Sequence, residues 1–181
     1  MGRDKASLPW GAGDLLDHTI VRLSAVTGDV RILCGPQPRY EDRGRAVLPD
    51  TVADVGGLAA LATALRALQP GQTALLLAVD LPSVPADLLR HLARAADDAD
   101  AAVPASPAGA EPFCAAYRSS CGPAVERAIR EGRLKMTGFW ADVRILPVEG
   151  AVLAAFGDPV QMFSNLNTPQ EYERARAATG P

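Results

Sequence analysis

The sequence predicts an α/β domain whose sheet is mostly parallel, with a mixed C-terminal part. Over the first two-thirds of the 181 residues, segments with apolar residues at helical spacing alternate with short, almost entirely apolar runs. This alternation is typical of a parallel sheet built from right-handed crossovers. After Gly109 the order of elements becomes irregular, which indicates strands of both directions. A chain of this length corresponds to one domain, with 1–108 and 109–181 as its halves.

The first half is expected to contain three helices and three strands. The helices cover 14–27, 56–69 and 85 to about 96, and the strands cover 30–34, 73–79 and 101–104. The first helix carries an apolar stripe at helical spacing. Pro85 suits the first turn of the third helix, where no backbone donor is needed. The run at 73–79 has the composition of a strand that is covered on both faces.

The second half is expected to contain two strands and two helices. The strands cover 112–118 and 143–148, and the helices cover 122–132 and 168–178. Thr168 followed by Glu171 predicts a capping box at the start of the last helix, with Pro169 at its first position. These three residues therefore have a structural explanation that needs no ligand.

The composition excludes several classes of protein. With a net charge of −3, the chain lacks the basic surface of a nucleic-acid-binding protein, so any phosphate site must be local. Its longest apolar run is far too short to cross a membrane, and its polar first residues do not form a signal peptide. We therefore expect a cytoplasmic protein. Cys34, Cys114 and Cys121 are expected to be buried, reduced thiols, with a disulfide or a metal site as the alternative.

Residues 2–8, Gly-Arg-Asp-Lys-Ala-Ser-Leu, could form a phosphate-binding loop. A glycine-containing loop ahead of a helix can hold a triphosphate through backbone amides, and Arg3 and Lys5 would add two cationic side chains. Lys5 is one of two lysines in a chain whose other basic residues are nearly all arginines, which favours a need for a compact ammonium group. The alternative is a solvated terminal segment.

Asp80 directly follows the strand at 73–79. The carboxyl end of a central parallel strand is where α/β sheets bind ligands, and a carboxylate there can hold Mg²⁺ that bridges nucleotide phosphates. Pro82 and Pro85 stiffen the turn that presents this acid. The alternative is that Asp80 caps the next helix.

Two asparagines precede the last helix. Asn165 and Asn167 alternate along an extended segment and therefore point the same way. Their amides could complete a Mg²⁺ shell or bind a pterin or phosphate. The alternative is that they close a turn and do nothing else.

Two weaker candidates lie elsewhere in the chain. Asp50 could accept hydrogen bonds from a nucleobase, and Gly56 and Gly57 would let the start of a helix lie close to a base or ribose. Arg118, at the end of the strand 112–118, could place a guanidinium near an anionic acceptor. Glycine at a helix start and a solvated arginine on a core strand also occur without function.

Taken in order, these segments resemble the molybdenum cofactor guanylyltransferase family, within the wider nucleoside-triphosphate-transferase group. Residues 1–5 match the end of the family's loop L-x-G-G-x-S-x-R-M-G-x-D-K. An acid before a glycine pair, the D-x-P turn at Asp80, the motif x-P-h-x-A-x-Y-R that ends at Arg118 and the ending N-x-N-T-P-x-[ED] at 165–171 follow. The match spans essentially the whole chain, and its ending favours this family over the sugar-phosphate nucleotidyltransferases.

The resemblance implies a three-layer α/β/α, Rossmann-like nucleotide-diphospho-sugar transferase fold, in which 1–108 bind the nucleotide and 109–181 bind the acceptor. It implies that GTP, bound with Mg²⁺, is attacked at its α-phosphorus by the terminal phosphate of molybdopterin, and that pyrophosphate leaves. Positioning and charge neutralisation suffice for this reaction, so no covalent enzyme intermediate is needed.

On the nucleotide side, the resemblance implies that Arg3 and Lys5 contact the triphosphate. It places Asp50, Gly56 and Gly57 near the guanosine.

On the acceptor side, the resemblance implies that Asp80 holds the metal and is catalytic together with Lys5. Asn165 would serve the metal and the acceptor, and Asn167 and Arg118 would serve the acceptor. Molybdoenzyme chaperones are further candidate partners, whereas nucleic acid and membranes are not expected.

The sequence departs from the family pattern near its start. The L-x-G-G segment and the strand before it are absent, and Gly35 stands where the family often has asparagine. The loop at 56–60 also reads Gly-Gly-Leu-Ala-Ala instead of the commoner Gly-Pro-Leu-Ala-Gly. In this fold the absent strand lies between 30–34 and 73–79, and its loss would leave backbone groups unpaired on both sides. We therefore expect codons upstream of Met1 to encode it. For the chain as it stands, we expect 30–34 and 73–79 either to pair directly or to be separated by a large groove.

Two alternatives remain open. A related cytidylyltransferase, or another small-molecule nucleotidyltransferase, would share the scaffold and prefer a different nucleotide. A non-catalytic protein that binds the cofactor or a partner would account for the shortened loop. The presence of Lys5, Asp80 and both asparagines argues against it.

Overall fold

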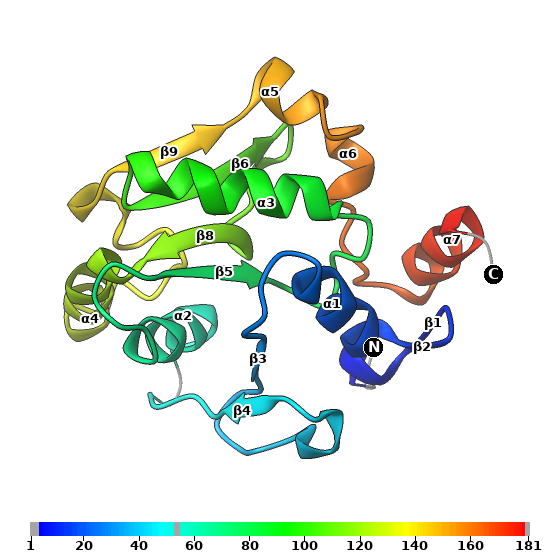
Figure 1. Cartoon of the computed structure of the whole chain (residues 1–181), viewed down its shortest axis with the longest axis horizontal. Coiled ribbons are helices and arrows are strands. Elements are labelled where there is room, and N and C mark those ends of the chain that lie inside the picture. The colour runs from blue at the N-terminus through cyan, green and yellow to red at the C-terminus, as the bar shows by residue number, and fades with distance from the viewer. Residues whose placement is uncertain (1–3, 53–54, 180–181) are drawn as a thin grey trace.

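The main sheet contains strands from both halves of the chain. The computed structural model describes residues 4–52 and 55–179 (Figure 1). The strands β5 (Thr73–Leu77), β8 (Cys114–Arg118), β6 (Ala101–Ser106) and β9 (Ile145–Val148) lie in that order, and β7 (Gly109–Ala110) forms a hairpin with β6. β8 is antiparallel to both of its neighbours, and β9 is parallel to β6. β5, β6 and β9 therefore share one direction, whereas β8 and β7 run in the opposite one, so the main sheet is mixed.

Helices cover both faces of this sheet. The helices of the described chain are α1 (Leu15–Ser24), α2 (Gly57–Arg66), α3 (Ala86–Ala95), α4 (Gly122–Arg130), α5 (Gly150–Ala154), α6 (Pro159–Met162) and α7 (Pro169–Thr179), with 3₁₀ turns at Lys5–Ser7, Glu41–Arg43, Ala96–Asp98, Ser119–Cys121 and Trp140–Asp142. Along β8, Ala115 and Tyr117 join the core formed with α2 and α4, whereas Cys114 and Ala116 join the core formed with α3. Successive strand residues point to opposite faces, so the sheet is the middle of three layers.

Short elements of two to five residues were not predicted. They are the hairpin of β1 (Pro9–Trp10) and β2 (Gly13–Asp14), the strands β4 (Ala46–Leu48) and β7, and the helices α5 and α6. The predicted helices and strands are all present, with ends that differ by a few residues. For example, α1 ends at Ser24 instead of residue 27, because Ala25 already caps it.

The three cysteines, Cys34, Cys114 and Cys121, are buried free thiols, as expected. Burial raises the pKa of Cys114 and raises the pKa of Cys121 to about 12. Both groups are therefore protonated and unreactive at neutral pH.

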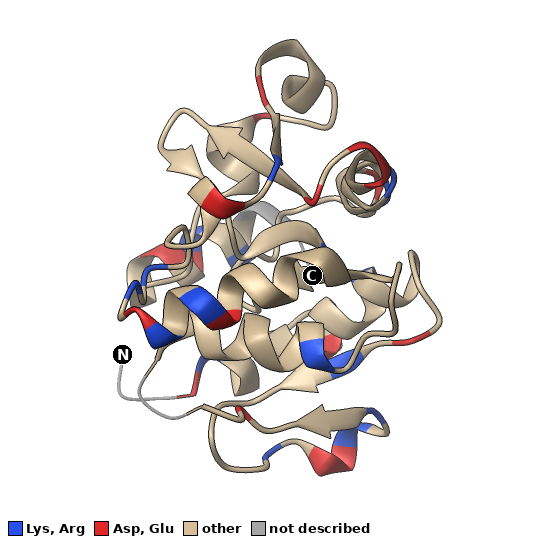
Figure 2. Cartoon of the chain, turned by 90° about the vertical axis from the view of Figure 1, so that its left-hand side faces the viewer, with Lys and Arg blue, Asp and Glu red and all other residues tan. Residues whose placement is uncertain are grey.

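Charged residues of both signs are distributed over the elements instead of gathering on one of them (Figure 2). This distribution agrees with the expectation that any phosphate site is local. Among the helices that the structure describes, none has the length and apolar character needed to cross a membrane.

A smaller sheet lies apart from the main one. β3 (Arg31–Leu33) pairs in parallel with β4. No strand in the described part of the chain pairs with the other edge of β3 or with the outer edge of β5. Figure 1 shows the β3–β4 pair below β5, separate from the main sheet.

A groove of about 740 Å³ lies between β3 and β5. Its walls include the consecutive residues 30–33 and 73–80, together with apolar side chains of α1 and α2. Because consecutive residues of each strand line the groove, the backbone edges of both strands face it. The N–H and C=O groups on these edges are not paired by any strand of the described residues. Of the two outcomes expected for this region, direct pairing of the strands or a large groove, the structure has the groove.

The first and last segments of the described chain pack together. Trp10 is buried in a cluster with Leu15, Leu166 and Tyr172. The Tyr172 hydroxyl also donates a hydrogen bond to the carbonyl of Pro9. This contact holds the segment around residue 5 beside the segment that precedes α7.

Candidate active site

Lys5, Asp80 and Asn167 meet at the carboxyl end of β5. The Lys5 ammonium lies 3.0 Å from Asp80 Oδ2 and donates a hydrogen bond to Asn167 Oδ1 at 2.7 Å. The side chains of Lys5 and Asp80 are 30% and 24% exposed, so the pair is accessible to a ligand from one side. Three residues from three distant parts of the sequence thus form one cation–carboxylate–amide cluster.

Asp80 is presented by a rigid turn between β5 and α3. Leu81 and Val84 of this turn are buried. The Nε2 atom of His18 in α1 lies 3.0 Å from the carbonyl oxygen of Pro82, a contact in which the ring donates. Burial lowers the pKa of His18, which favours the neutral ring. Asp80 does not cap α3, whose N-cap residue is Pro85, so the alternative role for this acid is excluded.

The segment before α7 is fixed by its own hydrogen bonds. Glu171 Oε2 accepts from the backbone amides of Asn167 and Thr168, and Thr168 Oγ1 accepts from the amide of Glu171, which confirms the capping box. The amide of Leu166 donates to the carbonyl oxygen of Asp80 at 3.2 Å. Asn165 and Asn167, on either side of Leu166, are therefore both brought to the end of β5.

Asp50 lies at the end of β4, on the far side of the groove from Asp80. Its amide donates to the carbonyl of Gly35 at 2.8 Å. Its Oδ1 atom is buried and has no hydrogen-bond partner among the described residues. Burial also raises the pKa of this carboxyl group. An unsatisfied acceptor of this kind suits a ligand with N–H donors.

The two glycines at the start of α2 have different structural reasons, one in the backbone and one in a neighbouring side chain. Gly56 has φ +64° and ψ −145°, a conformation that is essentially restricted to glycine. A Cβ atom on Gly57 would lie 2.3 Å from the ring of Phe113. The structure does not bring either glycine into contact with Lys5 or Asp80.

Arg118 does not reach this site. It pairs with Thr73 in the β5–β8 ladder, which places it beside the start of β5 and not beside its end. Its guanidinium donates to the carbonyl of Asp97. The length of β5 alone, four steps of about 3.3 Å, separates Arg118 from the turn that carries Asp80. Arg3 lies outside the described residues.

Two residues beside the site carried no sequence signal. Tyr40 donates from its hydroxyl to Asp4 Oδ2 at 2.5 Å, and Arg39 lies 3.6 Å from the same oxygen. Both follow β3 in a loop rich in proline and glycine, where neither periodicity nor a motif marks them. Desolvation and the Asp4 carboxylate raise the pKa of Tyr40 to about 12.

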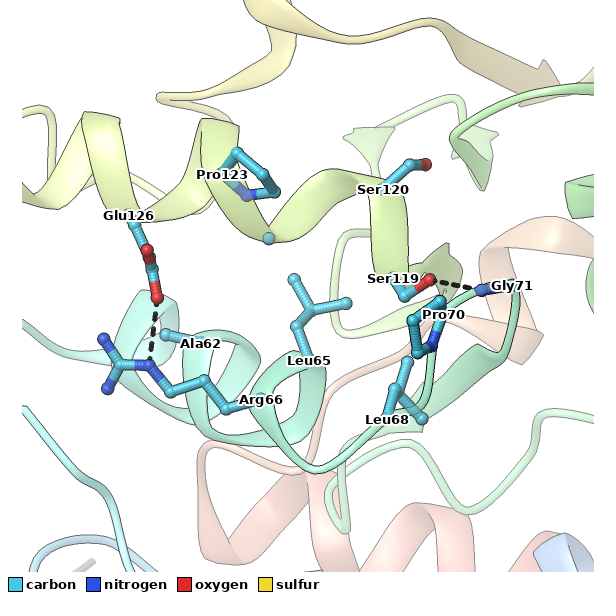
Figure 3. Close-up of a pocket in the computed structure, with 11 residues that line it drawn as sticks. Ala62, Leu65, Arg66, Leu68, Pro70, Gly71, Ser119, Ser120, Pro123 and Glu126 are labelled. Atoms are coloured by element: carbon cyan, nitrogen blue, oxygen red, sulfur yellow. Dashed lines mark hydrogen bonds and ion pairs between the residues drawn. The ribbon is translucent and has the colours of Figure 1, made fainter.

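A second hollow, of about 530 Å³, lies at the other end of β5 between α2 and α4 (Figure 3). Arg66 and Glu126 form an ion pair across it, and the Ser119 hydroxyl accepts a hydrogen bond from the amide of Gly71. None of the residues singled out from the sequence lines it.

The donor atoms at the end of β5 suit a hard divalent cation. Asp80 offers a carboxylate, and Asn165 and Asn167 offer amide oxygens, which are ligands that Mg²⁺ accepts. Within residues 4–52 and 55–179, no group of three or more His, Cys, Asp or Glu side chains could hold a metal ion alone. A cation here would therefore share its coordination with a ligand such as a phosphate.

Comparison with known proteins places this arrangement in a family. Residues 1–141 match the MobA-like NTP transferase domain. A probable molybdenum cofactor guanylyltransferase from Pelotomaculum thermopropionicum is 30% identical over 97% of this chain and 85% of its own length.

Two solved structures share the fold. The molybdopterin-guanine dinucleotide biosynthesis protein A of Archaeoglobus fulgidus superposes with a TM-score of 0.80 at 24% identity, over 98% of this chain and 91% of that one. Rv0371c of Mycobacterium tuberculosis, solved in complex with manganese, has a TM-score of 0.62 at 16% identity, over 97% of this chain and 93% of that one. The three-layer fold is thus that of nucleotidyltransferases, and by its sequence match the chain belongs to the MobA-like NTP transferase family.

Proposed function

We propose that this chain transfers GMP from GTP to molybdopterin, the organic part of the molybdenum cofactor, and releases pyrophosphate. The name of the relative from Pelotomaculum thermopropionicum supports guanylyl transfer in this pathway. The observation that carries the proposal is the convergence of Lys5, Asp80 and Asn167 at the carboxyl end of β5. The ammonium group would bind the triphosphate, the carboxylate would bind its metal ion, and the amide would bind the incoming phosphate.

In the proposed reaction, an oxygen of the acceptor's phosphate attacks the α-phosphorus of GTP. The bond from that phosphorus to the oxygen bridging the α- and β-phosphates breaks, and pyrophosphate leaves. Lys5 would exchange its contact with Asp80 for the triphosphate and so neutralise part of the charge on the leaving group. We assign Mg²⁺ to Asp80 and Asn165, where it would add charge neutralisation at the phosphates.

Residues 1–108 are the proposed nucleotide-binding half. The buried, unpartnered oxygen of Asp50 supports a contact with the N–H groups of guanine, and Gly56 and Gly57 would border the guanosine. Arg3 is kept as a proposed triphosphate contact. Both asparagines, Asn165 and Asn167, are proposed to hold the acceptor in the half formed by residues 109–181.

Several further assignments rest on the family and on this reaction. We place the reaction in the cytoplasm and include molybdoenzyme chaperones among the partners that could receive the product. Arg118 is not proposed as an acceptor contact, because it lies beside the start of β5.

The first experiment is thermal unfolding of the chain with Mg²⁺ and saturating GTP, compared with CTP and with no nucleotide. A ligand at about a hundredfold its dissociation constant stabilises the folded state by about 2.7 kcal/mol. For a domain of this size, the midpoint should rise by about 5–10 °C. A rise that requires GTP and Mg²⁺ is expected. A rise with CTP instead would favour cytidylyl transfer, and no rise with either nucleotide would contradict the proposal and favour a non-catalytic protein.

A further inference from the structure

A cation in the loop after β3 lies beside the site but is not part of the cluster around Asp80. We propose that Arg39 is a further nucleotide-binding residue, which contacts the phosphate chain beside Lys5. This inference rests on the proposed function, since it names an additional contact for the same substrate.

Two contacts link Arg39 to the residue before Lys5 and to the end of β3. Its Nη1 atom lies 3.6 Å from Asp4 Oδ2, and Asp4 immediately precedes Lys5. Its Nη2 atom donates to the carbonyl of Cys34 at 3.1 Å, at the end of β3. Arg39 therefore lies between the end of β3, near Asp50, and the segment that carries Lys5. A nucleotide whose base contacts Asp50 and whose phosphates contact Lys5 would pass this position.

The guanidinium of Arg39 has donors to spare. Arg39 carries five N–H groups, of which the structure shows one making a hydrogen bond, since 3.6 Å is too long for another. Its side chain is 54% exposed. By contrast, Arg43 in the same loop is 21% exposed and bonded to both Asp14 and Asp17 at 2.7 Å, so its fork is already occupied.

Asp4 would not lose its partners if Arg39 turned to a phosphate. Its Oδ1 accepts from the amide of Ala6 at 3.1 Å, and its Oδ2 accepts from the Tyr40 hydroxyl at 2.5 Å. The long ion pair with Arg39 is thus the contact that can be exchanged. A planar guanidinium can then hold two phosphate oxygens at once, which an ammonium cannot match.

The backbone of the loop supports a functional role for this position. Tyr40 has φ +67° and is the non-glycine residue with positive φ in the described chain. A bulky residue adopts this conformation at a cost in free energy, and such strain clusters at ligand sites. Here the strain is held by the Asp4 bond and by the Arg39 guanidinium, which lies 5.2 Å from the centre of the Tyr40 ring. The strained residue therefore contacts both Asp4, next to Lys5, and the Arg39 guanidinium.

The test compares Arg39→Ala with Arg31→Ala in binding of GTP and of guanosine, with Mg²⁺ present. Arg31 is a matched control because it is also a partly exposed arginine of the β3 region, 39% exposed, and is paired with Asp29 away from Lys5. Loss of a charge-assisted contact to phosphate should weaken GTP binding by about 10- to 100-fold in R39A and leave guanosine binding unchanged. R39K should recover part of the loss, because it restores the charge without the fork.

Unfolding midpoints of both alanine variants without nucleotide check that the fold is intact. Equal GTP affinity in R39A and R31A would overturn the inference, and so would an equal loss for GTP and guanosine, which would assign Arg39 to the base or to folding. If the unsubstituted chain binds no GTP with Mg²⁺, the proposed function fails first, and this inference fails with it.

Discussion

Asp80→Asn separates a structural from a functional role for the ion pair at the end of β5. The change removes the charge that Lys5 faces at 3.0 Å and keeps the size of the side chain. Because the two side chains are 30% and 24% exposed, the pair should contribute at most about 1 kcal/mol to the free energy of unfolding. For a domain of this size, that corresponds to a fall in the midpoint of at most about 4 °C. The effect on turnover should be much larger, at least about 100-fold, since several kcal/mol of charge stabilisation would be lost.

The assay measures pyrophosphate release from GTP with molybdopterin and Mg²⁺ present. Thermal unfolding of the same samples measures stability. Asp87→Asn is the matched control, because Asp87 lies in the first turn of α3, is 79% exposed and pairs with Arg90 at 2.5 Å. D87N should keep full activity. D80N should also lose the dependence of GTP binding on Mg²⁺. Turnover in D80N equal to that in D87N would refute the assignment of Asp80 to the metal, and a fall in the midpoint well beyond 4 °C would show that its role is structural.

Two further predictions concern the stability of the fold. His18→Gln should flatten the loss of stability between pH 7 and pH 5. Burial lowers the folded-state pKa of His18 from 6.5. The neutral ring therefore contributes fully to the free energy of unfolding above pH 6.5, and this contribution is lost as the pH falls through the lowered pKa. Chemical denaturation across this range measures the effect, and an equal effect of His91→Gln would contradict the prediction. Gly138→Ala should destabilise the fold by about 1–3 kcal/mol, since its Cβ would lie 2.5 Å from the carbonyl oxygen of Arg133. Gly122→Ala, whose Cβ would meet no atom within 4 Å beyond its chain neighbours and its own helix backbone, should leave the unfolding midpoint nearly unchanged. Equal midpoints for the two variants would argue against the clash.

Much of the fold could be predicted from periodicity. The strand 73–79 and the helices around 14–27, 56–69 and 85–96 have long apolar patterns, and the structure places elements at each of them. β4 and α5 could not be predicted in this way, because three or five residues do not complete a pattern that distinguishes helix from strand.

The site was harder to predict than the fold. The order of motifs singled out Lys5, Asp80 and Asn167, but that they touch depends on how the first and last segments pack, which no local pattern records. Arg118 shows the opposite error. The motif that ends at Arg118 does not reveal which way its strand runs in the sheet. In the antiparallel ladder, the end of β8 lies beside the start of β5. Arg39 acts through a loop conformation, so no spacing rule could have found it.

The groove between β3 and β5 also affects how the protein behaves in concentrated solution. Two open strand edges that face an apolar trough are a template for pairing with extended segments of other molecules. We therefore expect self-association that grows with protein concentration and with time at elevated temperature. A short, soluble peptide of apolar β-branched residues that occupies the trough should suppress this aggregation, because it would pair both edges at once.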